Sequence, residues 1–357
     1  MMKKNVKMGI ALLLAMLLIS TSFAGCTSYD ENYAIFELWI AGVKVTTRNQ
    51  ADILGDGTVS YVGDGECGTL TLNGADIGET SDLDADAMII SLIDDLTINL
   101  VGDSKIGMGE KAPVNGISAY DLTIQGEGSL EIGARASCIT ADTVIVESGK
   151  VDTYIKTAED ELASFIGVGF WAQELLKING GDIRVHYAPE FAMMSYGLYC
   201  AKDLTINGGS IEIKEEDAAA LGIGIISSEK LNINGGNISV YGNDDAMNAK
   251  TFAMTGGTVN ACAKDVFLLG FDPTLGIPLF GSDGVCRLVN KAEFSGGCLT
   301  ITALERVNLD TPIFFSKDLT VAGMKVSGGE NADHLAQKDS ATYTYTDTCV
   351  RIEKEAN

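Results

Sequence analysis

The sequence is poor in histidine, proline and cationic side chains, and it carries no familiar catalytic motif. Of 357 residues, 2 are His, 5 are Pro and 2 are Trp, and 25 Lys and Arg stand against 49 Asp and Glu. No C-x-x-C, G-x-S-x-G, H-E-x-x-H or P-loop pattern occurs, which argues against the common zinc, hydrolase and nucleotide sites. The formal net charge of −24 argues against nucleic acid as a partner, because a phosphate backbone would be repelled.

The chain is rich in glycine and has enough apolar residues to form a core. It contains 41 Gly, and 46% of its residues are hydrophobic. With so little proline, this glycine content indicates many tight turns rather than a disordered linker. The strong acidity suits cations, or a partner bridged by cations; the alternative is that it only keeps an exported protein soluble.

The N-terminus has the pattern of an export signal. A basic region (Lys3, Lys4, Lys7) precedes the apolar stretch Met8–Ile19, which is too short for a confident bilayer span. The small residues just before Cys26 are typical of a bacterial lipoprotein signal. We therefore expect residues 1–25 to be removed, Cys26 to carry the lipid, and the protein to be anchored on the extracellular face of the cell membrane. Ordinary secretion is the alternative.

One short phrase recurs along the chain. It reads "LKINGGDIRV", "LTINGGSIEI" and "LNINGGNISV", with each Asn-Gly-Gly turn flanked by alternating apolar residues. The first four double-glycine turns follow one another at steps of 28, 27 and 21 residues. Short strands separated by turns at such a period predict an all-β solenoid of the parallel β-helix type. Glycine there can adopt positive φ, and Asn179, Asn207 and Asn234 are expected to form a hydrogen-bonded ladder.

The β-helix is expected to span residues 81–330. Residues 26–32 form a polar tether, residues 33–80 an N-terminal β cap module and residues 331–357 a C-terminal cap, since an open end would expose core and unpaired backbone. Residues 158–173 and 266–285 are predicted to be surface loops. The seven cysteines after Cys26 are scattered, so we expect buried thiols, with one or two disulfides as the alternative.

Acidic residues recur eight or nine positions beyond the double-glycine turns. Stacked carboxylates about 5 Å apart repel each other by about 1 kcal/mol even in water, so such a column favours a bound cation. Ca²⁺ fits best because it takes six to eight oxygen ligands. Solvated turn caps are the alternative explanation. The predicted metal ligands are Glu190, Glu216, Asp217, Asn243, Asp244, Asp245 and Asp265.

Aromatic residues near the same edge are candidate sugar-binding residues. Flat rings suit the C–H faces of carbohydrates, although tyrosine in a solenoid also serves packing. The candidates are Trp171 in a loop, and Tyr187, Tyr196 and Tyr241, with Tyr199 nearby. No catalytic residues are predicted. A lyase would need a base beside calcium, for which Arg184 and Lys264 are available.

The quoted phrases, together with "FAMTGGTVNA", resemble the clostridial carbohydrate-binding right-handed parallel β-helix family, whose fold is related to that of pectate lyases. The segment "LWIAGVKVTTRNQADILGDGTVSY" is similar to one found in exported proteins that carry such domains. The resemblance covers residues 36–330. It implies a right-handed parallel β-helix, calcium at acidic turns and binding of a plant polysaccharide, either pectin or cellulose.

Three functions follow from these observations. The first is a monomeric, cell-surface, calcium-assisted and non-catalytic polysaccharide-binding protein. The second is a polysaccharide lyase of the same fold, and the third is a non-catalytic adhesin or spacer. An acidic pectin would have to be held through Ca²⁺, because its direct contact with this acidic protein is repulsive.

Overall fold

The computed structural model describes residues 33–78, 87–109, 112–156, 166–187, 194–215, 221–243, 245–263, 270–272, 277–279, 286–304, 313–321 and 323–355. Ile35–Asn357 forms one compact unit. The described residues are all-β and contain no helix, so none of them forms a helix long and apolar enough to cross a membrane.

The strands form two large sheets and one small one. Sheet A has 17 strands: β1 (Ile35–Ile40), β2 (Val43–Thr46), β3 (Val59–Gly63), β4 (Cys67–Leu72), β6 (Ala87–Ser91), β7 (Asp95–Leu100), β9 (Asn115–Ser118), β10 (Asp121–Gly126), β12 (Ser137–Val146), β14 (Ile166–Ile178), β16 (Met194–Cys200), β17 (Asp203–Ile206), β19 (Leu221–Ile233), β21 (Asp245–Met254), β25 (Cys286–Phe294), β27 (Phe314–Phe315) and β28 (Asp318–Thr320). Sheet B has 12 strands: β5 (Asp76–Ile77), β8 (Asp103–Ile106), β11 (Ser129–Ala134), β13 (Lys150–Ile155), β15 (Asp182–Tyr187), β18 (Ser210–Glu215), β20 (Asn237–Gly242), β22 (Thr258–Ala263), β26 (Cys298–Ala303), β29 (Met324–Gly329), β30 (Leu335–Gln337) and β31 (Cys349–Lys354). The third sheet is the antiparallel pair β23 (Gly270–Asp272) and β24 (Ile277–Leu279).

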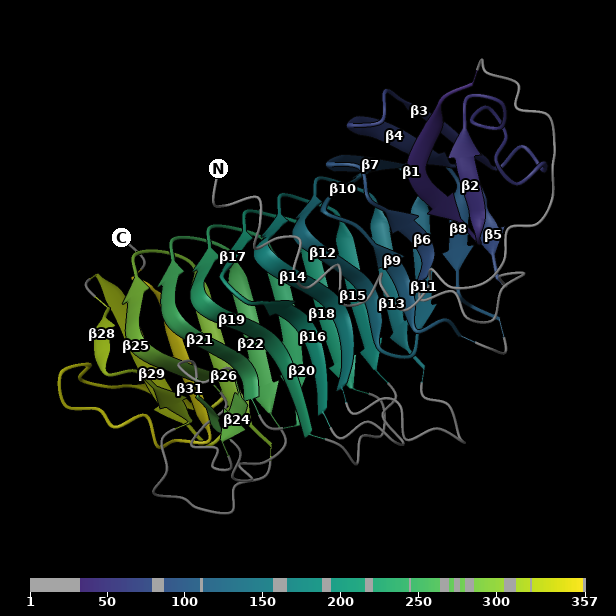
Figure 1. Cartoon of the computed structure of the whole chain (residues 1–357). Helices are drawn as coiled ribbons and strands as arrows, with labels where there is room; N and C mark the ends of the chain where they lie inside the picture. The colour runs from purple at the N-terminus through teal and green to yellow at the C-terminus, as the bar shows by residue number, and fades with distance from the viewer. Residues whose placement is uncertain are drawn as a thin grey trace. The chain divides into compact units, whose positions relative to one another are not determined.

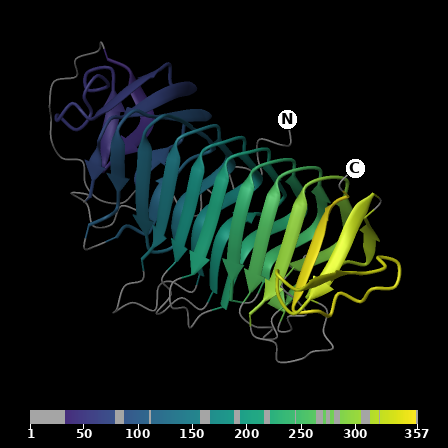
Figure 2. The ribbon, with the colours of Figure 1, turned by 180° about the vertical axis from the view of Figure 1, so that it is seen from behind.

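From β10 to β22 the chain alternates between sheets A and B, except that β16 and β17 follow one another in sheet A (Figure 1). Strands of the same sheet pair in parallel, and β16 and β17 together fill the place of one long strand between β14 and β19. The long sheet A strands curve at an irregularity in register, which falls between Ala141 and Thr143 in β12 and between Ser227 and Lys230 in β19. We call the part before this irregularity the first half of sheet A. Figure 2 shows the arrows of sheet B side by side, from behind.

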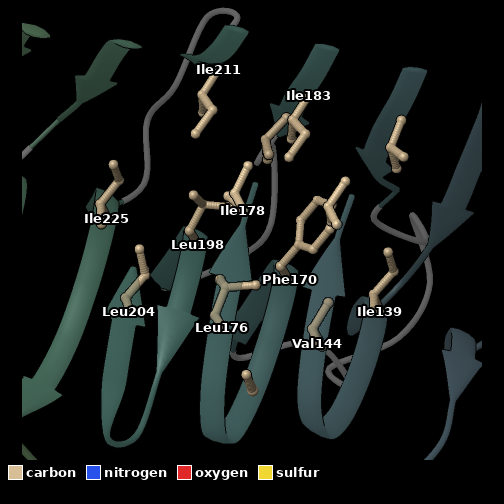
Figure 3. Close-up of a cluster of buried hydrophobic side chains, with 14 of the residues drawn as sticks. Ile139, Val144, Phe170, Leu176, Ile178, Ile183, Leu198, Leu204, Ile211 and Ile225 are labelled. Atoms are coloured by element: carbon tan, nitrogen blue, oxygen red, sulfur yellow. The ribbon is translucent and has the colours of Figure 1, made fainter. Parts of the chain in front are cut away.

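The core lies between the two sheets, where alternate residues of most strands point inward. Figure 3 shows Phe170, Leu198 and Ile225 from successive sheet A strands with Ile183 and Ile211 of sheet B. All five are at most 1% exposed. Aliphatic side chains in parallel register stack on their equivalents in the next strand, about 4.8 Å away, and this continuous burial is the main stabilising term.

The Asn-Gly-Gly turns connect sheet A to sheet B, as the sequence predicts. The second glycine of each turn has positive φ, for example +86° at Gly209 and +92° at Gly236. The predicted asparagine ladder is confirmed by hydrogen bonds from Asn207 Nδ2 to Asn179 Oδ1 (2.7 Å) and from Asn234 Nδ2 to Asn207 Oδ1 (2.8 Å).

Antiparallel strands close both ends of the strand stack. At the N-terminal end β1 pairs with β2 and β6, and β3 pairs with β4. At the C-terminal end β31 lies antiparallel between β26 and β29, so the ladder of parallel strands in sheet B stops there. Such strands shield the core at the ends of the stack.

Two expectations need correction or completion. Residues 166–173 are not a surface loop, because β14 begins at Ile166 and the Phe170 side chain is fully buried. Six cysteines among the described residues are free thiols. Cys138, Cys200 and Cys349 are buried, and Cys67 is exposed. Burial raises the pKa of Cys138 to about 12 and that of Cys200 to about 11.

Candidate functional site

The outer face of the first half of sheet A carries a row of side chains that crosses six strands. In register, Ser118 of β9 pairs with Thr140, Thr140 with Trp171, Trp171 with Tyr199, Tyr199 with Ile226 and Ile226 with Asn248. The centre of this stretch is aromatic and apolar, with the polar residues Ser118 and Thr140 on one side and Asn248 on the other. The register continues to Ile90 and Trp39 beyond Ser118, and to Arg287 beyond Asn248. The residues on either side of Trp171 point into the core, so the strand pleat places the indole on the outer face.

A second row runs beside the first on the same face. Val168, Tyr196 and Ile223 pair in register on β14, β16 and β19, with Asp245 next to Ile223 on β21. Val168, Tyr196, Ile223 and Ile226 form a hydrophobic cluster separate from the main core, against which Trp171 and Tyr199 pack. We call these six residues the aromatic strip.

The three aromatic rings of the aromatic strip form a chain of contacts, in which Tyr199 lies against both Trp171 and Tyr196. The centroids of Trp171 and Tyr199 are 4.5 Å apart at 36°, and those of Tyr196 and Tyr199 are 5.7 Å apart at 27°. Trp171 and Tyr199 are half-buried, whereas Tyr196 is only 4% exposed and supports the other two. Burial raises the pKa of the Tyr199 phenol. The rings offer apolar surface to a flat ligand.

Glycines on the inward side hold the first half of sheet A close to sheet B. Gly169, Gly197 and Gly224 align between the two outward rows. A Cβ atom at Gly197 would lie 2.7 Å from Ile213 Cγ2, and one at Gly224 would lie 2.1 Å from Val240 Cγ2. Larger side chains would force the sheets apart, so these glycines fix the surface on which the aromatic strip stands.

The structure places the four predicted sugar-binding residues on two different sheets. Trp171 and Tyr196 come together in the aromatic strip, and Tyr199 joins them. Tyr187 and Tyr241 lie instead on sheet B, in β15 and β20. Sequence reasoning missed Val168, Ile223 and Ile226, whose only signal is that "IGVGFW" and "LGIGII" are apolar on both faces of the strand.

Of the predicted calcium ligands, only Asn243 and Asp245 are among the described residues. Asn243 Oδ1 accepts a hydrogen bond from Tyr241 Oη at 3.3 Å, and the buried Asp245 accepts one at Oδ2 from Asn248 at 3.2 Å. The described ranges contain no group of three or more His, Cys, Asp or Glu placed to hold a metal. Cys26 and the other predicted ligands lie outside the described residues; these ligands are Glu190, Glu216, Asp217, Asp244 and Asp265.

The two available calcium ligands supply too few oxygens by themselves. Ca²⁺ takes six to eight oxygen ligands, and Asn243 and Asp245 each carry oxygen of the type it prefers. Both residues lie beside the connection from β20 in sheet B to β21 in sheet A. Further ligands for a calcium ion would have to come from other connections.

Comparison with known proteins places one family on part of the chain. A family model described as "Carbohydrate-binding domain-containing protein" matches residues 155–265, which include the whole aromatic strip. No curated protein matches the chain, and no solved structure does. The family match supports a carbohydrate-binding role.

Proposed function

We propose that the protein binds a polysaccharide at the aromatic strip. The observation that carries this proposal is the contact between Trp171 and Tyr199 on the outer face of sheet A, inside the stretch matched by the family model. The C–H face of a pyranose is apolar and gains by leaving water for an aromatic ring. Ser118 and Thr140, which are half-buried beside the aromatic strip, can form hydrogen bonds with sugar hydroxyls.

The polysaccharide lies across the strands in this proposal. The row from Ser118 to Asn248 is perpendicular to the strands and advances by one strand spacing, about 4.8 Å, for each side chain. A linear glycan aligned with the row meets a new side chain at every strand. The ligand is a plant polysaccharide, pectin or cellulose, and the protein holds it without cleaving it.

We further propose that the fold is a right-handed parallel β-helix, anchored outside the cell through a lipid on Cys26. The parallel strands that return to sheets A and B in turn, and the asparagine ladder at three successive crossings, support the helix. Ca²⁺ at the acidic turns would stabilise the connections, and it would bridge an acidic glycan to this acidic chain.

A polysaccharide panel tests the function. Full-length mature protein is incubated with pectin, cellulose and neutral soluble glucans, once with Ca²⁺ and once with chelator, and both binding and ultraviolet-absorbing unsaturated products are measured. The proposal expects binding without product release. Release of unsaturated products would identify the lyase instead, and failure to bind any of these polysaccharides in Ca²⁺ would refute a binding role.

A further inference from the structure

The outer face of sheet B carries a second group of aromatic and forked polar side chains, on β13, β15 and β18. Tyr154 pairs in register with His186, and His186 with Lys214. The rings of Tyr154 and His186 are stacked with centroids 4.6 Å apart and an interplanar angle of 6°. Both rings are half-buried, so part of each remains open to a ligand.

Ion pairs surround the two rings. Lys150 Nζ lies 2.8 Å from Asp152, Arg184 Nη2 lies 3.0 Å from Asp182, and Lys214 Nζ lies 2.8 Å from Glu212. Three bases and three acids give this face no net formal charge, although the whole chain carries −24. The hydrogen bond from Lys214 lowers the pKa of Glu212, which stays ionised. A neutral ligand that offers both donors and acceptors matches such a face better than an anion does.

The Asp152 carboxylate independently indicates that this face binds a ligand with a hydrogen-bond donor. Its side chain is on the same outward side of β13 as Tyr154, but Asp152 is only 5% exposed. Lys150 holds Oδ2, whereas Oδ1 has no hydrogen-bond partner among the described residues. A buried acceptor without a donor costs about 1–3 kcal/mol, so it calls for an explanation. The Lys150 and Arg184 side chains beside it are 40% and 39% exposed and can move aside to admit a hydroxyl group.

We propose that this face of β13, β15 and β18 is a second carbohydrate site, which takes a neutral pyranose. The sugar hydroxyls bond to Asp152 Oδ1 and to the forked groups of Arg184 and Glu212, and the sugar C–H surface covers Tyr154 and His186. The site lies on a different sheet from the aromatic strip, although β14 and β15 are consecutive in the chain. One protein molecule therefore holds two glycan chains and links them.

Linking two chains changes how the protein acts on a polymer. When one site is occupied, the second glycan segment binds at a high effective concentration, so retention on a polysaccharide network exceeds the affinity of either site. A protein with two sites cross-links soluble glycan chains, whereas a protein with one site does not.

Titration calorimetry with a short neutral oligosaccharide counts the sites in full-length mature protein. The expected stoichiometry is two for the wild type, and one for both Trp171→Ala and His186→Ala. The double variant is expected to bind none. Asp152→Asn tests the buried acceptor separately, with at least a tenfold weaker second site. Asn260→Ala, an exposed change on the same face two strands beyond β18, is the matched control and keeps both sites.

The outcomes separate this site from the aromatic strip. Wild-type stoichiometry of one, abolished by Trp171→Ala and unaffected by His186→Ala, overturns the second site and leaves the first intact. Stoichiometry of one that depends on His186 alone, together with no Trp171-dependent binding of a short acidic pectin oligosaccharide in Ca²⁺, overturns the aromatic strip instead. Thermal unfolding of each variant shows whether a binding site is lost because the variant misfolds. If His186→Ala misfolds, Tyr154→Phe, which keeps the ring stack, must retain two sites.

Discussion

The side-chain amide of Asn207 donates a hydrogen bond to the Oδ1 of Asn179 at 2.7 Å, across 28 residues of sequence. Asn234 donates to Asn207 in the same way, and Thr255 Oγ1 donates to Asn234. Asn179 itself donates to Glu147 at the other end. Each amide thus acts as donor and acceptor, and the ladder ties five successive turns together.

Replacing Asn207 with Ala should interrupt the ladder at its centre. Two hydrogen bonds are lost, but the site is exposed and water replaces them in part, so we expect a loss of about 1–2 kcal/mol in unfolding free energy. Denaturant unfolding measures it. Asn237→Ala is the control, because Asn237 is also exposed and lies next to the following turn. Equal losses in the two variants would contradict a stabilising ladder.

Gly209→Ala should cost more than an alanine elsewhere at positive φ. Gly209 has φ +86°, and an added Cβ would lie 2.7 Å from the carbonyl oxygen of Gly181. Gly55 has φ +79°, but nothing lies within 4 Å of its Cβ position. Gly55→Ala therefore carries only the conformational cost, about 1–2 kcal/mol, and Gly209→Ala carries the clash in addition. Melting temperatures that fall equally would show that the turns do not approach closely.

The buried thiols predict a loss of stability at alkaline pH. Burial raises the pKa of Cys138 from 9.0 to about 12, so the thiol ionises more readily in the unfolded chain than in the folded protein. The stability linked to this thiol is fully present below pH 9 and is lost as the pH rises towards 12. Cys138→Ala should flatten this part of the stability curve, as urea unfolding between pH 8 and 11 can measure. An unchanged slope would mean that the thiol is accessible in the folded state.

Calcium should raise the melting temperature of the mature protein, and chelator should reverse the rise. Binding to the folded state alone stabilises it by about 2.7 kcal/mol when the free ion is at 100 times its dissociation constant. Asp245→Asn should reduce the effect, because it removes the negative charge of one of the two described candidate ligands while keeping an oxygen there. Mg²⁺ serves as the control ion. A melting temperature that is the same with Ca²⁺ and with chelator would refute calcium sites at the acidic turns.

The sequence predicted the strand pairing well wherever one face of a strand is polar. Around Asn207 the alternation in "LTINGGSIEI" assigns each side chain to the core or to solvent, and the turn glycines mark where the chain changes sheet. The structure agrees there, including the hydrogen bonds between the asparagines.

The prediction failed where both faces of a strand are apolar. In "FIGVGFWAQ" the alternation disappears, because Val168 and Trp171 point outward while Phe170 points into the core. Gly169 lies between them and is required by the close approach of sheet B. The segment therefore read as a loop. The same break in pattern is what marks a strand with a second, outward-facing apolar surface.

The affinity of Trp171→Ala for the preferred polysaccharide tests the central claim most directly. The matched control is Trp39→Ala, because Trp39 is the only other tryptophan and is covered by Lys44 Nζ at 4.4 Å from its ring centroid. Trp39 lies on β1 in the same register row, but four strand spacings, about 19 Å, separate it from Trp171, so a short oligosaccharide bound at Trp171 does not reach it. In a short oligosaccharide titration, the aromatic strip predicts at least a tenfold weaker site for Trp171→Ala, about 1.4 kcal/mol, and no change for Trp39→Ala. Unchanged affinity in a folded Trp171→Ala protein would contradict the account.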